Sequence, residues 1–327
     1  MKLLITGAAG FIGSHFVDYV LDHHPEDTVI GLDKLTYAGN LDNLAGRLQD
    51  CRFRFFRADI CDREAVFPLL ERESVDCIVN FAAESHVDRS LQDPGVFLRT
   101  NVLGVGVLLD GTAQFGVSRF HQVSTDEVYG DLPLDRPELK FDEGSPLCPS
   151  SPYSASKAAA DLLALSYFRS FGTPVTITRS SNNYGPRQYP EKLIPRMIRR
   201  ARAGRPLPVY GDGRNVRDWI HVLDHCAAVD LVIRKGRVGE VYNVGGGNER
   251  SNLDLIRLLL SLMGKDEALI SFIADRKGHD RRYAVSTEKI STQLGWRPAV
   301  EFNSGIRETI RWYLRQPVSE LDPANLS

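Results

Sequence analysis

The sequence predicts an α/β fold in which a doubly wound parallel sheet is followed by a smaller, mixed α/β C-terminal domain. Over the first half of the chain, short apolar runs alternate with longer helical patterns, which is typical of strand–helix–strand units with right-handed crossovers. Several runs are apolar throughout, as expected for strands buried on both faces. Beyond about residue 180, prolines and glycines cluster between 185 and 214 and the elements become shorter. We therefore expect one domain at 1–180 and a second at 181–327.

The individual elements follow from these patterns. Strands are expected at 2–6, 28–33, 52–57, 76–81, 119–124 and 174–179, and helices at 11–23, 63–72, 96–115 and 152–171. In the second half, helical patterns recur at 222–235, 253–263 and 305–314. A strand-like run at 241–244 could return to the sheet of the first domain.

The composition argues against several classes of protein. Hydrophobic residues make up 43% of the 327 residues, the formal net charge is -2, and no run is rich in lysine or arginine, so we expect no nucleic-acid partner and no membrane. No apolar stretch approaches the roughly 20 residues of a membrane-spanning helix. The first five residues are too few for a signal-peptide core, so a cytoplasmic location is expected. The odd number of cysteines, without a Cys-x-x-Cys pair, favours reduced thiols and no metal: Cys51, Cys61, Cys77, Cys148 and Cys226.

A glycine-rich turn joins the first expected strand to the first expected helix. Gly7, Gly10 and Gly13, with Phe11 and Ile12 between them, would let the backbone turn tightly and approach a pyrophosphate. The helix that follows would then present its free N–H groups to the same anion. A glycine triplet alone is also compatible with a simple tight turn, but its place between a strand and a helix favours a Rossmann-type dinucleotide site.

Acidic residues at the ends of the next two strands refine this prediction. Asp33 ends the second strand, twenty residues beyond Gly13, where a carboxylate accepts hydrogen bonds from ribose hydroxyls and repels a 2′-phosphate. Asp33 therefore favours NAD over NADP, although the neighbouring Lys34 weakens the preference. Asp59 and Ile60 follow the third strand, either covering an adenine or forming a plain turn.

A tyrosine and a lysine lie four residues apart in the expected helix at 152–171. This spacing places Tyr153 and Lys157 on one helix face, one turn apart. A nearby ammonium group and a nicotinamide cation would lower the pKa of the phenol from its ordinary value near 10. The phenolate could then accept a proton from a sugar hydroxyl. A surface tyrosine beside a surface lysine is the alternative, which the glycine loop upstream makes the weaker interpretation.

Several longer segments carry a resemblance over nearly the whole chain. They are LTYAGNL at 35–41, AAESHVDRS at 82–90, STDEVYG at 124–130, SNNYGP at 181–186, PEKLIP at 190–195 and NVRDWI at 215–220. With these segments the sequence resembles the extended short-chain dehydrogenase/reductase family, and within it the dTDP-glucose 4,6-dehydratases. The resemblance implies an NAD-dependent lyase that converts dTDP-glucose to dTDP-4-keto-6-deoxyglucose.

The same resemblance implies a role for the residues after the fifth strand. Asp126 would protonate the departing C6 hydroxyl, Glu127 would take the C5 proton, and Thr125 would bind the C4 oxygen. Without the resemblance, two adjacent carboxyl groups are more often an ordinary strand-end pair, although burial and mutual repulsion can keep one of them protonated. Tyr153 would assist oxidation at C4, and the hydride would return to C6.

Further contacts are implied by the resemblance alone. Those to the cofactor are Ala82, Ala83, Thr100 and Asn183, and those to the sugar nucleotide are Ser85, Asn182, Lys192, Leu193, Pro208, Tyr210, Arg217, Asn252 and His279. Lys277 stands where proline is usual in the family, and the stretch 131–152 is shorter than in many relatives. Both departures weaken the expectation that these two segments close over the substrate as they do in the family.

Other activities on the same fold remain as alternatives. A 4-epimerase or a sugar-nucleotide decarboxylase would share the loop and the Tyr153–Lys157 pair, but neither needs Asp126. A GDP-mannose dehydratase is chemically nearer, although Asp33 and the PEKL segment fit NAD and a dTDP sugar better. A non-catalytic NAD-sensing protein would be expected to lack the tyrosine or the lysine. The resemblance also implies a homodimer in which the helices at 96–115 and 152–171 pair with their copies; both could instead be buried against the sheet.

Overall fold

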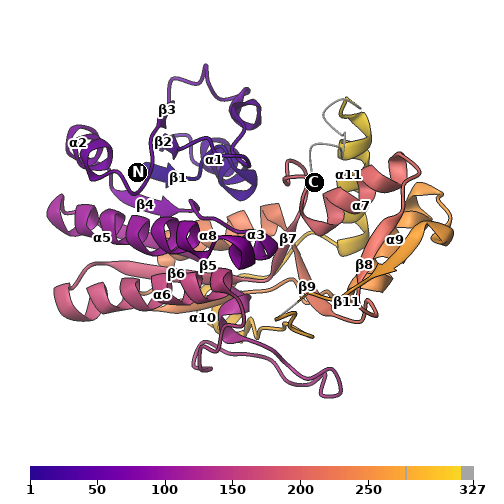
Figure 1. Cartoon of the computed structure of the whole chain (residues 1–327). Coiled ribbons are helices and arrows are strands. Elements are labelled where there is room, and N and C mark those ends of the chain that lie inside the picture. Colours follow the sequence, from indigo (N-terminus) through magenta and orange to yellow (C-terminus); the bar gives the residue numbers. More distant parts are fainter. Residues whose placement is uncertain (277, 318–327) are drawn as a thin grey trace.

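A computed structural model describes residues 1–276 and 278–317 of the chain, and Lys277 lies outside the described residues. Its central feature is a sheet of parallel strands in the order β10-β6-β5-β4-β1-β2-β3 (Figure 1). The strands are β1 (Lys2–Thr6), β2 (Thr28–Asp33), β3 (Phe53–Arg57), β4 (Cys77–Asn80), β5 (Arg119–Thr125), β6 (Val175–Ser180) and β10 (Val241–Val244). This order confirms the predicted doubly wound sheet, with the strand order reversing between β1 and β4.

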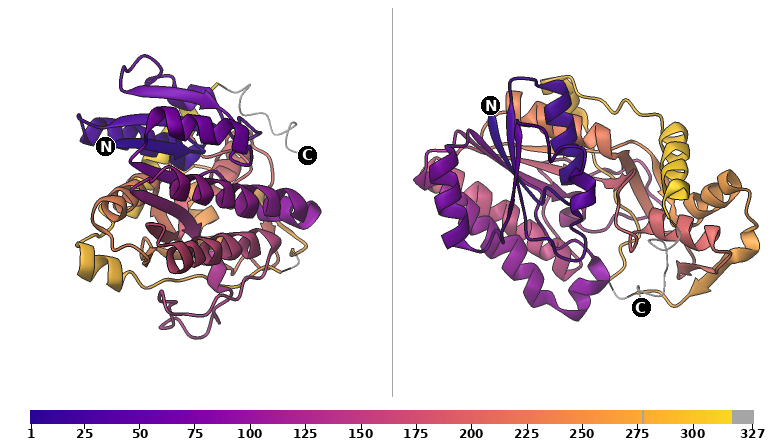
Figure 2. Two further views of the ribbon diagram at one scale, coloured as in Figure 1. Left: turned by 90° about the vertical axis from the view of Figure 1, so that its left-hand side faces the viewer. Right: turned by 90° about the horizontal axis from the view of Figure 1, so that it is seen from above.

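Helices cover both faces of this sheet (Figure 2). On one face, α2 (Arg63–Glu73), α5 (Gly104–Gln114) and α6 (Pro152–Phe171) bury Leu70, Leu108 and Ala160 in a shared core. On the other face, α1 (Phe11–His23) and α8 (Val222–Lys235) bury Phe16, Val20 and Val229. Because both faces are covered, β1, β2 and β4 are largely apolar and buried, as the apolar runs in the sequence predict, whereas the edge strand β3 is partly exposed.

A second group of elements packs beside the carboxyl ends of the strands. It contains a small sheet of β11 (Glu249–Ser251), β9 (Val216–His221) and β7 (Asn182–Tyr184), and the pair β8 (Leu207–Tyr210) and β12 (Ile270–Ile273). Around them lie α7 (Leu193–Arg202), α9 (Asn252–Met263) and α11 (Phe302–Arg315), which share one apolar core. The shorter helices of the chain are α3 (Val87–Gln92), α4 (Pro94–Leu98) and α10 (Glu288–Leu294), and the 3₁₀ turns are η1 (Leu41–Leu44), η3 (Asp126–Tyr129) and η4 (Glu267–Leu269).

Segments far apart in the sequence meet in the main sheet. The run at 241–244 returns as β10 and pairs in parallel with β6, and α8 packs against α1. The polypeptide beyond residue 180 therefore contributes to the layers around the cofactor loop, and the boundary at residue 180 stays an interpretation. The strands β7, β8, β9, β11 and β12 were not anticipated, because such short segments show too little periodicity, and α7 was not anticipated either.

The expected helix at 96–115 differs from the observed one in two ways. The observed helix begins earlier than expected, at Pro94 after the Asp93 cap. A π-helical segment, η2 (Arg99–Leu103), separates α4 from α5. The span from Pro94 to Gln114 has 21 residues and is long and apolar enough to cross a membrane by length and composition, contrary to the expectation that no stretch comes close. About 44% of its most apolar window is buried, and a core helix meets the same criteria, so this alone carries no membrane assignment.

Local chemistry explains where helix α6 begins. Ser151 and Ser154 form a reciprocal capping box, in which each side chain bonds the backbone N–H of the other residue. Pro152 occupies the first helical position, where its missing N–H costs nothing. The cap places Tyr153 in the first turn, directly beside the end of β5.

Candidate active site

A cleft runs along the carboxyl ends of β1, β2, β3, β4, β5 and β6 and reaches the loops of the second group of elements. Ligands of open α/β sheets bind at such a point, because the loops on either side of the order reversal separate there and leave a crevice. The cleft brings together side chains from the first glycine turn to Trp219.

The glycine turn has the shape that a pyrophosphate requires. A Cβ added at Gly13 would lie 2.1 Å from the carbonyl oxygen of Gly7, and one at Gly7 would lie 2.7 Å from the backbone nitrogen of Ala82. Any side chain at either position would force the turn apart. Gly10 caps α1 without a side-chain hydrogen bond, and no acidic residue occupies the first turn. The N–H groups of this helix end are therefore free to bind an anion.

The acidic residue after β2 is held in place by the backbone. Asp33 is buried, and its two carboxylate oxygens accept hydrogen bonds from the N–H groups of Ala9, at 3.0 Å, and Leu35, at 2.7 Å. Lys34 forms an ion pair with Asp59 at 2.7 Å. Because Asp59 neutralises Lys34, the lysine offers little charge to a 2′-phosphate, and the preference for NAD that Asp33 predicts is strengthened.

The cleft is lined by every residue that sequence reasoning assigned to the cofactor. These are Gly7, Gly10, Phe11, Ile12, Gly13, Asp33, Lys34, Asp59, Ile60, Ala82, Ala83, Thr100, Tyr153, Lys157 and Asn183. They come from the ends of β1, β2, β3 and β4 and from η2, α6 and β7, so the fold assembles a continuous surface from segments up to 176 positions apart. The turn, the free helix end and Asp33 together fit a dinucleotide.

Tyr153 and Lys157 line the cleft from helix α6. Both side chains are buried, and the ammonium of Lys157 donates a hydrogen bond to the carbonyl oxygen of Val123 in β5 at 2.6 Å. Burial raises the pKa of Tyr153, the charge of Glu127 raises it further, and a hydrogen bond with Thr125 opposes both. A cationic neighbour is therefore needed to lower the pKa of this phenol enough for it to act as a base.

The two carboxyl groups after β5 have different surroundings. Asp126 is fully buried; the hydroxyl of Thr125 lies 3.3 Å from its Oδ1, and its Oδ2 has no partner among the described residues. Burial raises the pKa of Asp126 well above its ordinary range, and the charges of Glu127 and Asp218 add to this. The geometry therefore favours a protonated Asp126.

Glu127 is only half-buried and lines the cleft. Burial also raises the pKa of its carboxyl, but the positive charges of Arg217, Arg276 and Lys192 oppose that increase. Adjacent carboxyl groups with such different neighbours can serve as an acid and a base.

The residues assigned to the sugar nucleotide divide into two groups. Ser85, Thr125, Asn182, Lys192 and Leu193 line the cleft, whereas Pro208, Tyr210, Arg217, Asn252 and His279 do not. Members of the second group are held by protein contacts instead. The guanidinium of Arg217 donates to the carbonyl oxygen of Asp280 at 3.0 Å and stacks on Tyr283, and the ring of His279 bonds Asp275 at 2.6 Å.

Other residues of the cleft wall were not anticipated as site residues. Tyr189 and Glu191 line it, together with Thr36, Ala38, Gly39, Glu84, Ser124, Ser180, Ser181, Gln188 and Trp219. The ring of Tyr37 packs against Tyr189, and the guanidinium of Arg89 lies 3.8 Å above the Tyr37 ring and pairs with Glu191 at 3.1 Å. The sequence signal for them was that most of these residues lie within the segments that carry the resemblance.

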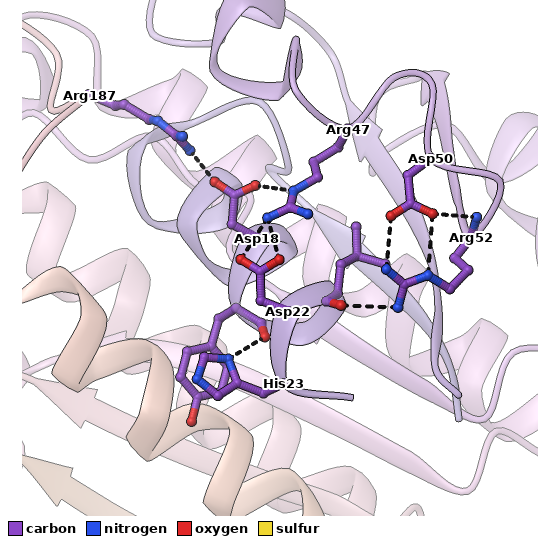
Figure 3. Close-up of polar contacts among 9 residues, drawn as sticks. Asp18, Asp22, His23, Arg47, Asp50, Arg52 and Arg187 are labelled. Atoms are coloured by element: carbon purple, nitrogen blue, oxygen red, sulfur yellow. Dashed lines mark hydrogen bonds and ion pairs between the residues drawn. The ribbon is translucent and has the colours of Figure 1, made fainter. Parts of the chain in front are cut away.

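Ion pairs attach one wall of the cleft to helix α1 (Figure 3). Arg187, just before the cleft-lining residues Gln188 and Tyr189, pairs with Asp18 of α1 at 2.7 Å. The second oxygen of Asp18 pairs with Arg47 at 2.6 Å, and Arg47 also bonds both oxygens of Asp22. This network fixes the segment after β7 against the helix that begins at the glycine turn.

Known proteins share this arrangement. The chain matches the family model described as GDP-mannose 4,6 dehydratase over residues 4–309. It is 51% identical to a dTDP-glucose 4,6-dehydratase of an Actinoplanes species over 96% of this chain and 98% of the relative. It is 52% identical to a low-salt glycan biosynthesis protein of Haloferax volcanii over 96% and 99%. A solved dTDP-glucose 4,6-dehydratase from Streptomyces venezuelae, with NAD and dTDP bound, superposes with a TM-score of 0.93 at 50% identity, covering 96% of this chain and 97% of that one.

These similarities extend over nearly all of both chains, so they concern the whole protein and not the cofactor loop alone. The family description names a GDP sugar, whereas relatives with about half of their residues identical are named for a dTDP sugar. The chain therefore belongs to the dTDP-glucose 4,6-dehydratases within the GDP-mannose 4,6 dehydratase family.

Proposed function

We propose that this protein dehydrates dTDP-glucose to dTDP-4-keto-6-deoxyglucose with NAD as its cofactor. One observation carries the proposal: beside the Tyr153–Lys157 pair, the end of β5 presents one carboxyl group whose surroundings keep it protonated and another that faces cations. A 4-epimerase needs only the tyrosine, the lysine and a small hydroxyl residue. Elimination of water additionally needs both an acid and a base, which Asp126 and Glu127 supply.

Each side chain has a defined task in this reaction. NAD, when bound, accepts a hydride from C4 of the hexose and returns it to C6. Tyr153 takes the proton of the C4 hydroxyl, Lys157 stabilises the phenolate, and Thr125 holds the C4 oxygen. The 4-keto group makes the C5 proton acidic, so Glu127 can remove it while Asp126 protonates the departing C6 hydroxyl. A proton then returns to C5.

The nucleotide diphosphate is assigned to the basic residues near Glu127. Lys192 lines the cleft, and Arg217 offers a planar guanidinium that can bind a diphosphate through two hydrogen bonds. We propose that His279, Asn252, Pro208 and Tyr210, which do not line the cleft, contact the nucleoside when substrate is present. The cytoplasmic location stays a prediction.

The direct test is to mix the purified protein with dTDP-glucose, without added NAD, and to identify the product by NMR. The proposed function requires a 4-keto-6-deoxy sugar. Formation of dTDP-galactose would instead show a 4-epimerase. Conversion of GDP-mannose in preference to dTDP-glucose would favour the activity in the family description.

The protein should retain NAD through purification, because the reaction regenerates the cofactor in each cycle. We expect the supernatant of denatured protein to contain NAD with little NADP on a chromatographic column. Asp33→Ala should reduce the retained NAD more than it reduces thermal stability, since it removes a ribose acceptor. A predominance of NADP would contradict the role of Asp33 and of the Lys34–Asp59 pair.

We further propose a homodimer built on the outer faces of α4–α5 and α6. Large apolar side chains are exposed there, namely Val96, Leu98, Leu103, Leu162 and Phe171. Burying such a patch against a second copy removes apolar surface from water. The expected result is a dimer mass by light scattering at micromolar concentration. Leu103→Glu combined with Leu162→Glu should give a monomer mass, whereas Leu314→Glu, at an exposed position on α11, should leave the dimer intact. A monomer mass for the unmodified protein would contradict the proposal.

A further inference from the structure

A buried ion pair lies behind the Tyr153–Lys157 pair and takes no part in the chemistry described so far. Asp161 follows Lys157 by four residues on α6, so Tyr153, Lys157 and Asp161 share one face of the helix. Asp161 is fully buried, and its Oδ2 pairs with Nε of Arg179 in β6 at 2.8 Å. Its Oδ1 is also buried and has no hydrogen-bond partner among the described residues. A buried carboxylate oxygen without a donor is rare and requires a physical reason.

The position of Arg179 explains why only one carboxylate oxygen is satisfied. Its Nη1 donates to the hydroxyl of Tyr129 at 2.9 Å, and its guanidinium lies over the Tyr129 ring at 4.9 Å. The Tyr129 hydroxyl donates in turn to Oδ1 of Asn243 in β10 at 2.8 Å. Since Arg179 is held at its far end by Tyr129, it reaches Asp161 with Nε alone. Part of the negative charge of Asp161 therefore remains available to another cation.

Among the described residues, no carboxylate lies within ion-pair distance of the Lys157 ammonium. The side chain of Lys157 is buried, and the one hydrogen bond found for its ammonium, to Val123 O, uses a single donor of three. A buried ammonium group without a nearby negative charge tends to lose its proton. Burial lowers the pKa of Lys157 to about 8, and the charge of Asp161 opposes this decrease.

The other charged groups around this face of α6 have partners or act elsewhere. On η3, Asp126 and Glu127 raise the pKa of Tyr153. On α5, Asp110 bonds Arg63 and the Tyr167 hydroxyl, and on α3, Asp88 and Arg89 pair with Arg276 and Glu191. Apart from the phenol of Tyr153, Asp161 is therefore the ionisable group on the lysine's own helix face that can compensate its charge.

We propose that Asp161, anchored by Arg179, is a positioning residue that keeps Lys157 charged and thereby enables it to stabilise the Tyr153 phenolate. Asp161 does not touch substrate or cofactor in this scheme. Its effect on turnover rests on the proposed function, but its effect on the charge of Lys157 can be measured without substrate.

The charge of Lys157 can be followed directly by NMR in protein labelled with ¹³C at the lysine ε positions. The Lys157 signal is assigned by its absence in Lys157→Met. In Asp161→Asn, we expect the titration midpoint of Lys157 to fall by about one pH unit or more, because a nearby opposite charge is lost. Asp161→Glu keeps the negative charge, so the Lys157 midpoint in this variant should stay close to that of the unmodified protein. An unchanged midpoint in Asp161→Asn would overturn the proposal.

The same variants have a signature in the pH profile of kcat. Lys157 is charged below its pKa, so kcat should fall at high pH as the lysine loses its proton. Because the pKa of Lys157 is expected to be lower in Asp161→Asn, this alkaline limb of the profile should move to lower pH. The matched control is Asp230→Asn on α8, on the opposite face of the sheet. It removes a buried carboxylate that pairs with Arg234 of the same helix and with His24, just after α1. That control should lose stability without moving the limb. A lower kcat with the limb at its original pH in Asp161→Asn would indicate a purely structural role.

A folding defect is a foreseeable complication, because Asp161→Asn leaves Arg179 buried without its anion. Asp161→Asn with Arg179→Met removes both charges of the pair and should still lower the Lys157 midpoint, by less than Asp161→Asn alone because the opposing charge of Arg179 is lost as well. If the shift occurs in a protein that makes no 4-keto-6-deoxy sugar, the proposed function fails while this inference stands. If product forms but no variant shifts the midpoint, the inference fails and the function stands.

Discussion

Glu127→Gln should separate oxidation of the sugar from elimination of water. Glutamine keeps the size and the hydrogen-bonding shape of the side chain but cannot remove the C5 proton. Absorbance of the reduced cofactor should therefore appear when dTDP-glucose is added and should persist. Product formation should fall by about 10²–10⁴-fold, the typical contribution of a general acid or base. The measurement is a stopped reaction with cofactor absorbance and product followed in parallel.

The control for this experiment is Glu138→Gln, an exposed carboxylate that pairs with Arg136 outside the cleft and should leave both signals normal. A substrate deuterated at C4 adds an independent check. The unmodified protein should give product with the label at C6, because the same hydride is returned within one molecule. Label found at C4 or in solvent, or product at the normal rate from Glu127→Gln, would remove the support for a dehydratase.

Tyr153→Phe should block the reaction one step earlier. Without the phenol, the proton of the C4 hydroxyl has no acceptor in the buried site, so the hydride cannot leave C4. We expect almost no absorbance of the reduced cofactor and a loss of turnover of about 10²–10⁴-fold. Retention of NAD should change little, because the glycine turn and Asp33 are untouched.

The two variants therefore predict opposite cofactor signals for the same loss of product. Accumulation of reduced cofactor in Tyr153→Phe would show that another group accepts the C4 proton. Lys157→Met provides the comparison, since it should resemble Tyr153→Phe at neutral pH if the ammonium is what makes the phenol acidic enough to act.

Local sequence was sufficient to place many elements. The bounds of β1, β2, α1, α6 and α8 agree with the expectation, because strong apolar patterns, caps and the glycine turn act over a few neighbouring residues. The strands β7 and β11, with three residues each, could not be found in this way. They exist because β9 lies beside them, and pairing partners distant in sequence leave no local pattern.

The candidate site likewise has a part that local sequence predicts and a part that depends on distant segments. Sequence alone was sufficient to predict the glycine turn, Asp33 at the end of β2 and the Tyr153–Lys157 pair. A turn and a helix face are formed by neighbouring residues, so they leave a local pattern in the sequence. The contacts of Arg217 and His279 to the sugar nucleotide, which the resemblance implies, stay predictions, and both residues lie outside the cleft lining. Their positions depend on packing between segments far apart in the chain.

Only the tertiary structure reveals the different surroundings that shift the pKa values of the carboxyl pair. Asp126 and Glu127 are neighbours in sequence, yet burial with Asp218 nearby favours the neutral form of one, and Arg217, Arg276 and Lys192 favour the charged form of the other. Likewise, Asp161 compensates Lys157 only because Tyr129 and Asn243 hold Arg179 at its far end. Electrostatic interactions depend on distance through space and on exclusion of water, so groups tens of residues away in the chain set the charge of each catalytic side chain.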